Sequence, residues 1–150
     1  MTTNEILARQ NFITKIPFKN GEETISKDLK VKIMSMRIDY SKVRKSFDED
    51  VQEFIKGVTP EGFAELQQKP NKNTEETDRL QEMIDKINSE YNSYIQTRGK
   101  EEVKINNTSL TEDEYNEIVV VNSDNDVEIN GQTIQAPDFL EILYSLFVEN

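Results

Sequence analysis

One long apolar stripe constrains this sequence more than any other feature. Between Leu29 and Phe54, apolar residues recur at steps of three or four, the spacing of one face of an α-helix of about seven turns. The stripe consists of Leu29, Ile33, Met36, Tyr40, Val43, Phe47, Val51 and Phe54. A narrow stripe of this length is typical of a helix that packs along another helix. The sequence therefore predicts a long helix, with Ser26 as its N-cap and Gly57 as its C-terminal cap.

A second stripe provides a partner for the first. It consists of Leu80, Met83, Ile84, Ile87, Tyr91, Tyr94 and Ile95. Thr74, which two glutamates follow, indicates the start of this helix, and Gly99 indicates its end. We expect an antiparallel hairpin of helices 26–57 and 74–98, packed stripe to stripe at about 20°. The pair Thr59-Pro60 predicts the start of a short connecting helix that ends before Pro70.

The first 25 residues are predicted to form an N-terminal arm with a short helix. Thr2 and Glu5 have the spacing of a capping box, and Lys19–Glu22 has the composition of a turn. Two stretches remain open between helix and strand. In residues 12–18, the apolar residues Phe12, Ile16 and Phe18 lie at even spacings, as on one face of a strand. Residues 29–33 also alternate, but the unbroken stripe to Phe54 favours a helix there.

The region after Gly99 contains short elements of both kinds. Val103–Ile105 is a strand candidate, and Thr111 with Glu114 forms a second capping box that predicts one or two helical turns. Ile118–Val121 is β-branched and apolar, which favours a buried strand. Val127–Ile134 contains two alternating strands around Asn-Gly, the preferred pair for a type I′ turn, and therefore predicts a β-hairpin.

A strongly apolar helix closes the sequence. Ala136-Pro137-Asp138 predicts its start, and its apolar positions are Phe139, Leu140, Ile142, Leu143, Leu146 and Phe147. These positions cover more than half of the helix circumference, so the helix is expected to be buried under the small sheet or in another subunit. The candidate interaction residues are therefore Phe139, Ile142, Leu143, Leu146 and Phe147.

Taken together, the elements predict a mainly α fold with a small β part (α+β). We expect one elongated domain made of an N-terminal arm (1–25), a helical hairpin (26–98) and an acidic strand–hairpin–helix module (99–150).

Composition excludes several kinds of site. The sequence has no Cys and no His, which removes disulfides, zinc fingers, Ser–His and Cys–His nucleophile pairs and most transition-metal sites. It also has no apolar run of about 18 residues, as a membrane helix requires. The first ten residues lack the basic and apolar regions of a signal peptide. We therefore expect a protein that is neither inserted in a membrane nor secreted by a signal peptide.

The formal charge of −11 lies at one end of the sequence. Residues 101–150 contain one Lys or Arg against 12 Asp or Glu, whereas residues 1–60 contain 11 against 9. This acidic third disfavours direct binding of nucleic acid. It could be simply solvated, which is the favoured interpretation, or it could face a basic protein surface. For the basic segment Arg37, Lys42, Arg44 and Lys45, pairing with this chain's own acidic third is preferred over binding of phosphate or of an acidic partner.

Two groups of carboxylates could suggest chemistry, but neither has the required pattern. Asp124–Glu128 places acids at alternate positions, as a calcium loop does, yet the sixth position is Ile129 and the twelfth is Gln135. Asp48–Asp50 lies on consecutive helical positions that point in different directions, whereas acid–base catalysis needs a desolvated, facing pair. We therefore predict no metal, no cofactor and no enzymatic activity. We expect Tyr91 and Tyr94 to pack in the core or in an interface.

The order of elements resembles that of a group of short proteins of tailed bacteriophages. The matching pieces are Asn4–Leu7, the run Leu29–Phe54 and the segment Ala136–Leu143. Those proteins are similar in having a short first helix, a long charged α-hairpin, a brief acidic strand region and a closing helix led by Pro-Asp. The Asn-Gly hairpin and the segment Thr59–Pro70 depart from this pattern.

Two functions follow as hypotheses. The first is a non-enzymatic structural or assembly protein, a small virion component such as a capsid auxiliary or head–tail protein, in the virion or the host cytoplasm. Its partners would be other virion or assembly proteins, or a second copy of itself. The second is a small acidic regulatory binder, such as a DNA mimic that inhibits a host nucleic-acid-binding protein.

Overall fold

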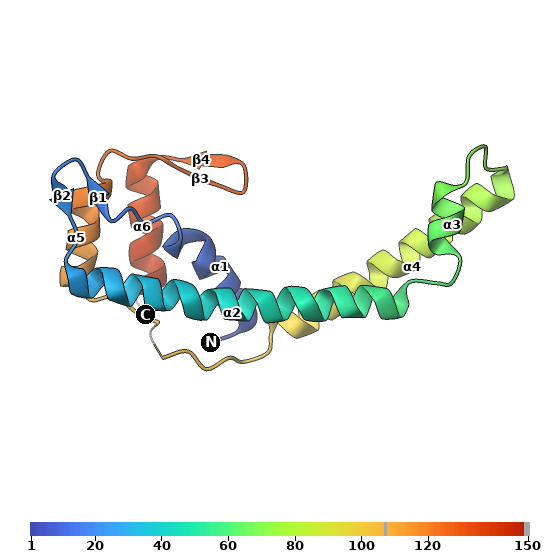
Figure 1. Ribbon diagram of the computed structural model, residues 1–150, viewed down its shortest axis with the longest axis horizontal. Helices are drawn as coiled ribbons and strands as arrows, with labels where there is room; N and C mark the ends of the chain where they lie inside the picture. Colours follow the sequence, from blue (N-terminus) through green and yellow to red (C-terminus); the bar gives the residue numbers. More distant parts are fainter. Residues whose placement is uncertain (107, 149–150) are drawn as a thin grey trace. The chain divides into compact units, whose positions relative to one another are not determined.

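The computed structural model describes residues 1–106 and 108–148, and over these residues the protein is mainly α-helical with a small β part, as predicted (Figure 1). The elements are α1 (Thr3–Ile13), β1 (Lys19–Asn20), β2 (Glu23–Thr24), α2 (Lys27–Val58), α3 (Phe63–Gln68), α4 (Thr74–Gly99), α5 (Glu112–Asn122), β3 (Val127–Ile129), β4 (Gln132–Ile134) and α6 (Ala136–Phe147).

The chain divides into two compact units. The terminal unit comprises Met1–Arg44 and Glu102–Asn150, and the helical unit comprises Lys45–Glu101. This division differs from the predicted segments 1–25, 26–98 and 99–150, because its first boundary falls inside α2. The first half of α2 is needed to complete the core that the two ends of the chain form.

The hydrophobic core lies in the terminal unit. Figure 1 shows α1, α5 and α6 on the same side of the first half of α2. The fully buried side chains of this core include Ile6 and Ile13 of α1, Leu29, Ile33, Met36 and Tyr40 of α2, Ile118 and Val121 of α5, and Phe139, Leu143 and Phe147 of α6. The first half of the long stripe therefore packs against short helices from both ends of the chain, rather than against α4 as predicted.

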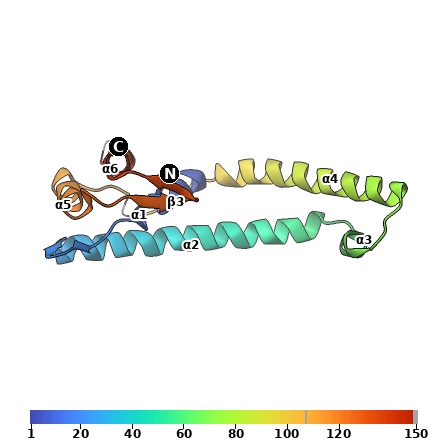
Figure 2. The ribbon, with the colours of Figure 1, turned by 90° about the horizontal axis from the view of Figure 1, so that it is seen from above.

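The second half of the stripe has the predicted partner. In the helical unit, the rings of Phe54 and Tyr94 stack with their centroids 4.2 Å apart, and Arg98 Nε lies 3.0 Å from Asp50 Oδ2. These pairs show that the end of α2 and α4 run antiparallel, as Figure 2 also shows. The helical hairpin is thus confirmed over Lys45–Val58, and α3 also contacts α4. Apolar side chains of this unit remain partly exposed.

The predicted junction after α2 is wrong. Gly57 lies inside α2, which ends at Val58, and α3 begins at Phe63 rather than at Thr59-Pro60. The hydroxyl of Thr59 donates a hydrogen bond back to the carbonyl oxygen of Ile55. Thr59 therefore stabilises the C-terminal end of α2 instead of starting the next helix. Gly62, with φ of 81°, occupies the N-cap position of α3.

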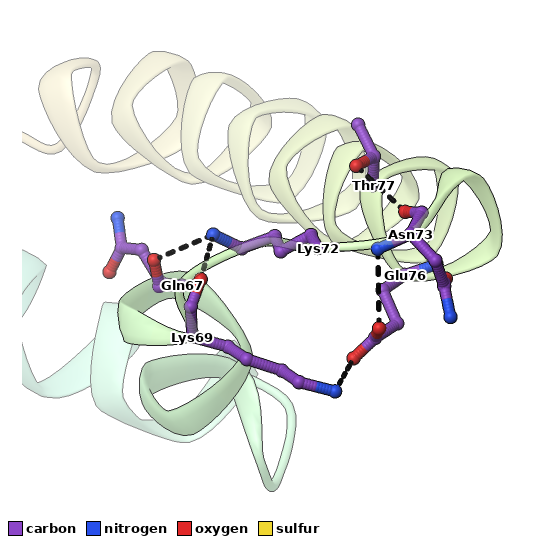
Figure 3. Close-up of polar contacts among 6 residues, drawn as sticks. All are labelled: Gln67, Lys69, Lys72, Asn73, Glu76 and Thr77. Atoms are coloured by element: carbon purple, nitrogen blue, oxygen red, sulfur yellow. Dashed lines mark hydrogen bonds and ion pairs between the residues drawn. The ribbon is translucent and has the colours of Figure 1, made fainter.

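The helix α4 begins at Thr74, as predicted, and the residue before it provides the N-cap. Asn73, not Thr74, is the N-cap: its side chain accepts a hydrogen bond from the Glu76 N–H at 2.8 Å, and the Glu76 carboxylate accepts one from the Asn73 N–H at 3.3 Å. Figure 3 shows this capping box together with the ion pair between Glu76 and Lys69. In the same loop, Lys72 Nζ donates to the carbonyl oxygens of Gln67 and Lys69. Several polar contacts therefore hold the turn into α4.

Three predicted or possible strands are absent from the described residues. Ile118–Val121 belongs to α5, because Ile118 and Val121 meet the core at helical spacing and Thr111 caps the helix. Val103–Ile105 forms no strand, although Thr2 and Glu102 make an isolated bridge. Residues 12–18 are not a strand, and residues 29–33 are helical as favoured.

The two hairpins are short and antiparallel. Strands β1 and β2 are joined through Gly21, with φ of 62°, within the predicted turn. Strands β3 and β4 are joined by Asn130 and Gly131, whose φ angles of 52° and 78° are those of the predicted type I′ turn. The Asn-Gly turn is therefore confirmed, whereas the turn predicted at Lys19–Glu22 is shorter, because Lys19 and Asn20 form β1.

Candidate functional site

A groove runs between α5 and α6 in the terminal unit. The two helices contact each other and leave a depression of about 500 Å³. Its lining residues are Tyr115, Val119, Pro137, Leu140, Glu141, Tyr144 and Ser145. Most of these side chains are apolar or aromatic, as in many binding sites.

Local sequence determines how the two walls begin. The capping box of α5 places the Thr111 hydroxyl 3.1 Å from the Glu114 N–H and the Glu114 carboxylate 2.9 Å from the Thr111 N–H. Pro137 occupies the first turn of α6, where its missing N–H costs no hydrogen bond. The Asp126 carboxylate accepts a hydrogen bond from the Ala136 N–H at 3.1 Å. Both helices therefore start at well-defined residues.

Two tyrosines contact each other in the groove lining. The rings of Tyr115 and Tyr144 meet edge to face, with centroids 5.0 Å apart and an angle of 75° between them. Tyr115 Oη donates to the carbonyl oxygen of Leu140 at 2.9 Å, and Tyr144 Oη contacts the Glu112 carboxylate. Burial raises the pKa of Tyr115, and the charges of Glu112 and Glu141 raise it further. Tyr115 therefore remains a neutral hydrogen-bond donor that fixes one wall of the groove.

The groove has acidic surroundings. Residues 112–122 of α5 contain four acidic and no basic side chains, and residues 136–147 of α6 contain two acidic and no basic ones. Glu141 lines the groove itself, and Glu112 contacts Tyr144 of the lining. A partner surface with apolar side chains and flanking positive charge would therefore complement this site.

Part of the acidic third is bound within the terminal unit. Glu114 pairs with Lys32 at 2.7 Å, and the Glu117 carboxylate accepts from the Ser26 N–H at 2.7 Å. Glu102 pairs with the amino terminus of Met1, also at 2.7 Å. These contacts tie the C-terminal segments to α2 and to the N-terminus.

The basic segment of α2 does not supply these partners, contrary to the preferred interpretation of the sequence. Arg37 donates to the carbonyl oxygens of Ile13 and Ile16 at 3.0 and 2.8 Å, which lie at and just beyond the end of α1. Arg44 contacts the Gln10 side chain. The remaining two members pair on α2 itself, Lys42 with Asp39 at 3.8 Å and Lys45 with Glu49 at 3.9 Å.

The five candidate interaction residues have two different environments. Phe139, Leu143 and Phe147 are fully buried in the core of their own unit, so they anchor α6 rather than face a partner. Ile142 and Leu146 are half-buried. The residues of α6 that line the groove are instead Pro137, Leu140, Glu141, Tyr144 and Ser145. Sequence reasoning missed Val119 because it assigned residues 118–121 to a strand. Without a continuous α5, it also did not identify Tyr115 as part of a groove wall.

The carboxylates that suggested chemistry have structural contacts. Asp124 accepts a hydrogen bond from the Asn20 amide at 2.9 Å, and Asp50 pairs with Arg98 at 3.0 Å. Among residues 1–106 and 108–148, no three acidic side chains gather as they would around a metal ion. No described helix combines the length and the apolar character needed to cross a membrane.

Comparison of this sequence and structure with known proteins gave no match, whether to protein-family models, to curated proteins or to solved structures.

Proposed function

We propose that this chain is a non-enzymatic assembly protein that acts through protein–protein contacts in the groove between α5 and α6. The observation that carries this proposal is the groove itself, which combines an apolar floor, a fixed pair of tyrosines and acidic surroundings. Tyrosine is enriched at protein interfaces because its ring buries a large apolar area while its hydroxyl keeps a polar partner.

The groove is pre-organised, and this favours a binding role for it over the alternative that it is an ordinary solvent-exposed depression. On one side, Phe139, Leu143 and Phe147 anchor α6 in the core; on the other, Ile118 and Val121 anchor α5. A partner would therefore not have to order either wall, and less of the binding free energy would be lost to ordering.

The class of partner is proposed from the resemblance to short proteins of tailed bacteriophages. It favours a small virion component, such as a capsid auxiliary or head–tail protein. The segments that carry the resemblance include Ala136–Leu143, which forms most of one wall of the groove.

Co-purification with particles tests this function. Tagged wild-type chain and two variants would be supplied to cells that produce the particles of the encoding genome, and mass spectrometry would quantify the chain in intact purified particles. Val119→Lys places a charge in the groove lining, whereas its neighbour Val120→Lys is the matched control, because Val120 is 54% exposed and outside the lining. We expect wild type and Val120→Lys in the particles and at least about tenfold less Val119→Lys. Absence of the wild-type chain from particles would contradict the proposal.

The alternative is an acidic regulatory binder or DNA mimic, which the excess of carboxylates in residues 101–150 favours. A mimic needs free carboxylates in rows that resemble phosphates, yet Glu114 and Glu117 already have partners in the terminal unit. Reproducible capture of one polymerase or nuclease by the wild-type chain, competed by DNA, would favour this alternative instead.

A further inference from the structure

A second apolar surface lies on the first half of α2. Val31, Met34 and Ile38 are 60%, 51% and 55% exposed, and their spacing of three and four residues places them on one face of the helix. We call them the outer stripe. They lie on the opposite side of α2 from the buried Leu29, Ile33 and Met36, so the core of the terminal unit does not use them.

Basic residues flank the outer stripe. Single exposed apolar residues are ordinary on protein surfaces, but three consecutive ones on one helix face form a continuous patch. Lys27 lies one turn before Val31, and Lys42 lies one turn after Ile38. Residues 27–42 contain five basic and two acidic side chains, a net charge of +3, although Lys32 among them pairs with Glu114 of its own unit.

The α5/α6 groove complements this stripe in charge, chemistry and length. The two helices that form the groove contain six acidic and no basic side chains, a net charge of −6. Glu114 and Glu117 among them are bound within their own unit, and the other four carboxylates remain to attract a basic surface. At about 1.5 Å per residue, Val31 to Ile38 spans roughly 10 Å, and the lining of α6 from Pro137 to Ser145 spans roughly 12 Å. A helix face with apolar residues at this spacing is the usual occupant of an apolar groove between helices.

We infer that the outer stripe of one copy binds in the α5/α6 groove of a second copy. This inference names a partner for the groove and therefore rests on the proposed function. Contacts between identical surfaces are less favourable. Two grooves would bring acidic helices together, and two antiparallel stripes that pair Val31 with Ile38 would place Lys27 opposite Lys42.

Such a contact joins two different surfaces. Each bound copy therefore still presents one free stripe or one free groove, and further copies can add until the ends meet in a ring or an open chain grows. The contact is small, so we expect association at tens to hundreds of micromolar, as for weak interfaces. Opposite charges flank the two surfaces, so added salt should weaken association.

Two complementary variants test the inference by sedimentation velocity from about 10 µM to about 1 mM, the range of a weak interface. Met34→Lys disrupts the stripe and leaves the groove intact, whereas Val119→Lys disrupts the groove and leaves the stripe intact. We expect the wild type to form species larger than a dimer. Each variant alone should associate at least about tenfold more weakly. An equimolar mixture should form a one-to-one dimer and nothing larger, because only one intact stripe and one intact groove can meet.

Controls separate loss of contact from loss of fold. Ser46→Lys and Val120→Lys add the same charge at exposed positions outside the two surfaces and should associate as the wild type does. Circular dichroism should show unchanged helix content in all four variants. A wild type that stays monomeric, or variants that associate alone as strongly as the wild type, would overturn the inference. A mixture that grows beyond the dimer would overturn it too. Incorporation of the chain into particles, with its dependence on Val119, would still stand in any of these cases.

Discussion

Glu114 joins two parts of the terminal unit through its carboxylate. It accepts hydrogen bonds from the Thr111 N–H at 2.9 Å and from Lys32 Nζ at 2.7 Å. Burial acts to raise the pKa of Glu114, but the hydrogen bonds from Lys32 and Thr111 outweigh it, so the pKa is lowered overall. The unfolded chain therefore binds the proton more strongly than the folded one. The stabilisation is fully present above the ordinary pKa of Glu and is lost as the pH falls through the lowered value.

The replacement Glu114→Gln tests this linkage. At pH 7 we expect the free energy of unfolding to fall by about 1–2 kcal/mol, because a charge-assisted hydrogen bond between α5 and α2 is lost. At a pH below the lowered pKa of Glu114 the difference from the wild type should shrink, because the wild-type carboxyl is then protonated too. Urea denaturation at both pH values measures this effect, with the exposed Glu128→Gln as control. An equal difference in the free energy of unfolding at both pH values would show that the charge of Glu114 does not contribute to this stabilisation.

Neighbouring residues of α6 should differ sharply in their contribution to stability. Leu143 is fully buried, whereas Ile142 beside it is half-buried. We expect Leu143→Ala to lower the free energy of unfolding by about 3 kcal/mol, since it removes apolar contact and leaves a cavity. Ile142→Ala should cost less than half as much, about 1 kcal/mol. Chemical denaturation of both variants checks this, and equal losses would contradict the burial of α6 described above.

At the scale of the element, sequence reasoning succeeded where neighbouring residues determine the structure. The capping boxes of Thr2 and Thr111 and the Asn130-Gly131 turn depend on residues within a few positions, and all three were predicted. The strand predicted for Ile118–Val121 failed because β-branched composition is a weak preference, which burial at helical spacing overrides. One wall of the groove was therefore missed.

The cap of α4 offers a test at the same scale. The Asn73 side chain accepts from the Glu76 N–H, and no apolar side chain of α4 itself is fully buried. We expect Asn73→Ala to reduce the stability of the helical unit by about 1 kcal/mol, whereas Asn73→Asp should retain most of it. Amide hydrogen exchange across the first turns of α4 measures the effect. Unchanged protection in Asn73→Ala would mean that the contacts of Lys69 and Lys72 suffice.

The partner of the long stripe could be predicted only in part. Periodicity identified α2 and α4 as helices, and Phe54 does stack on Tyr94. Nothing in the spacing distinguishes Leu29–Tyr40, which packs on α1, α5 and α6, from Phe47–Phe54, which faces α4. That distinction depends on contacts between residues about 100 positions apart, such as those between Met1 and Glu102 or between Arg9 and Thr108.

At the scale of the whole molecule, one helix belongs to two environments. Residues 27–44 of α2 pack on a closed core, whereas apolar side chains of residues 45–98 remain partly exposed. We expect the amides of Ile33–Tyr40 to exchange at least about tenfold more slowly than those of Val51–Ile55 in the same helix. Hydrogen exchange with mass spectrometry resolves the two segments. Equal rates throughout α2 would show that the two units unfold together.

The order of the units along the chain has a further consequence. Because the helical unit interrupts the terminal unit, a cut after Lys72 leaves two fragments that each hold part of the same core: Ile6 and Ile33 in one, Phe139 and Leu143 in the other. Trypsin-nicked protein should therefore elute from a sizing column as one species and separate only in denaturant. Fragments that part without denaturant would contradict this. Two fragments expressed separately should likewise associate and fold together. The chain could therefore serve as a split reporter, in which one fragment folds only when the other is present.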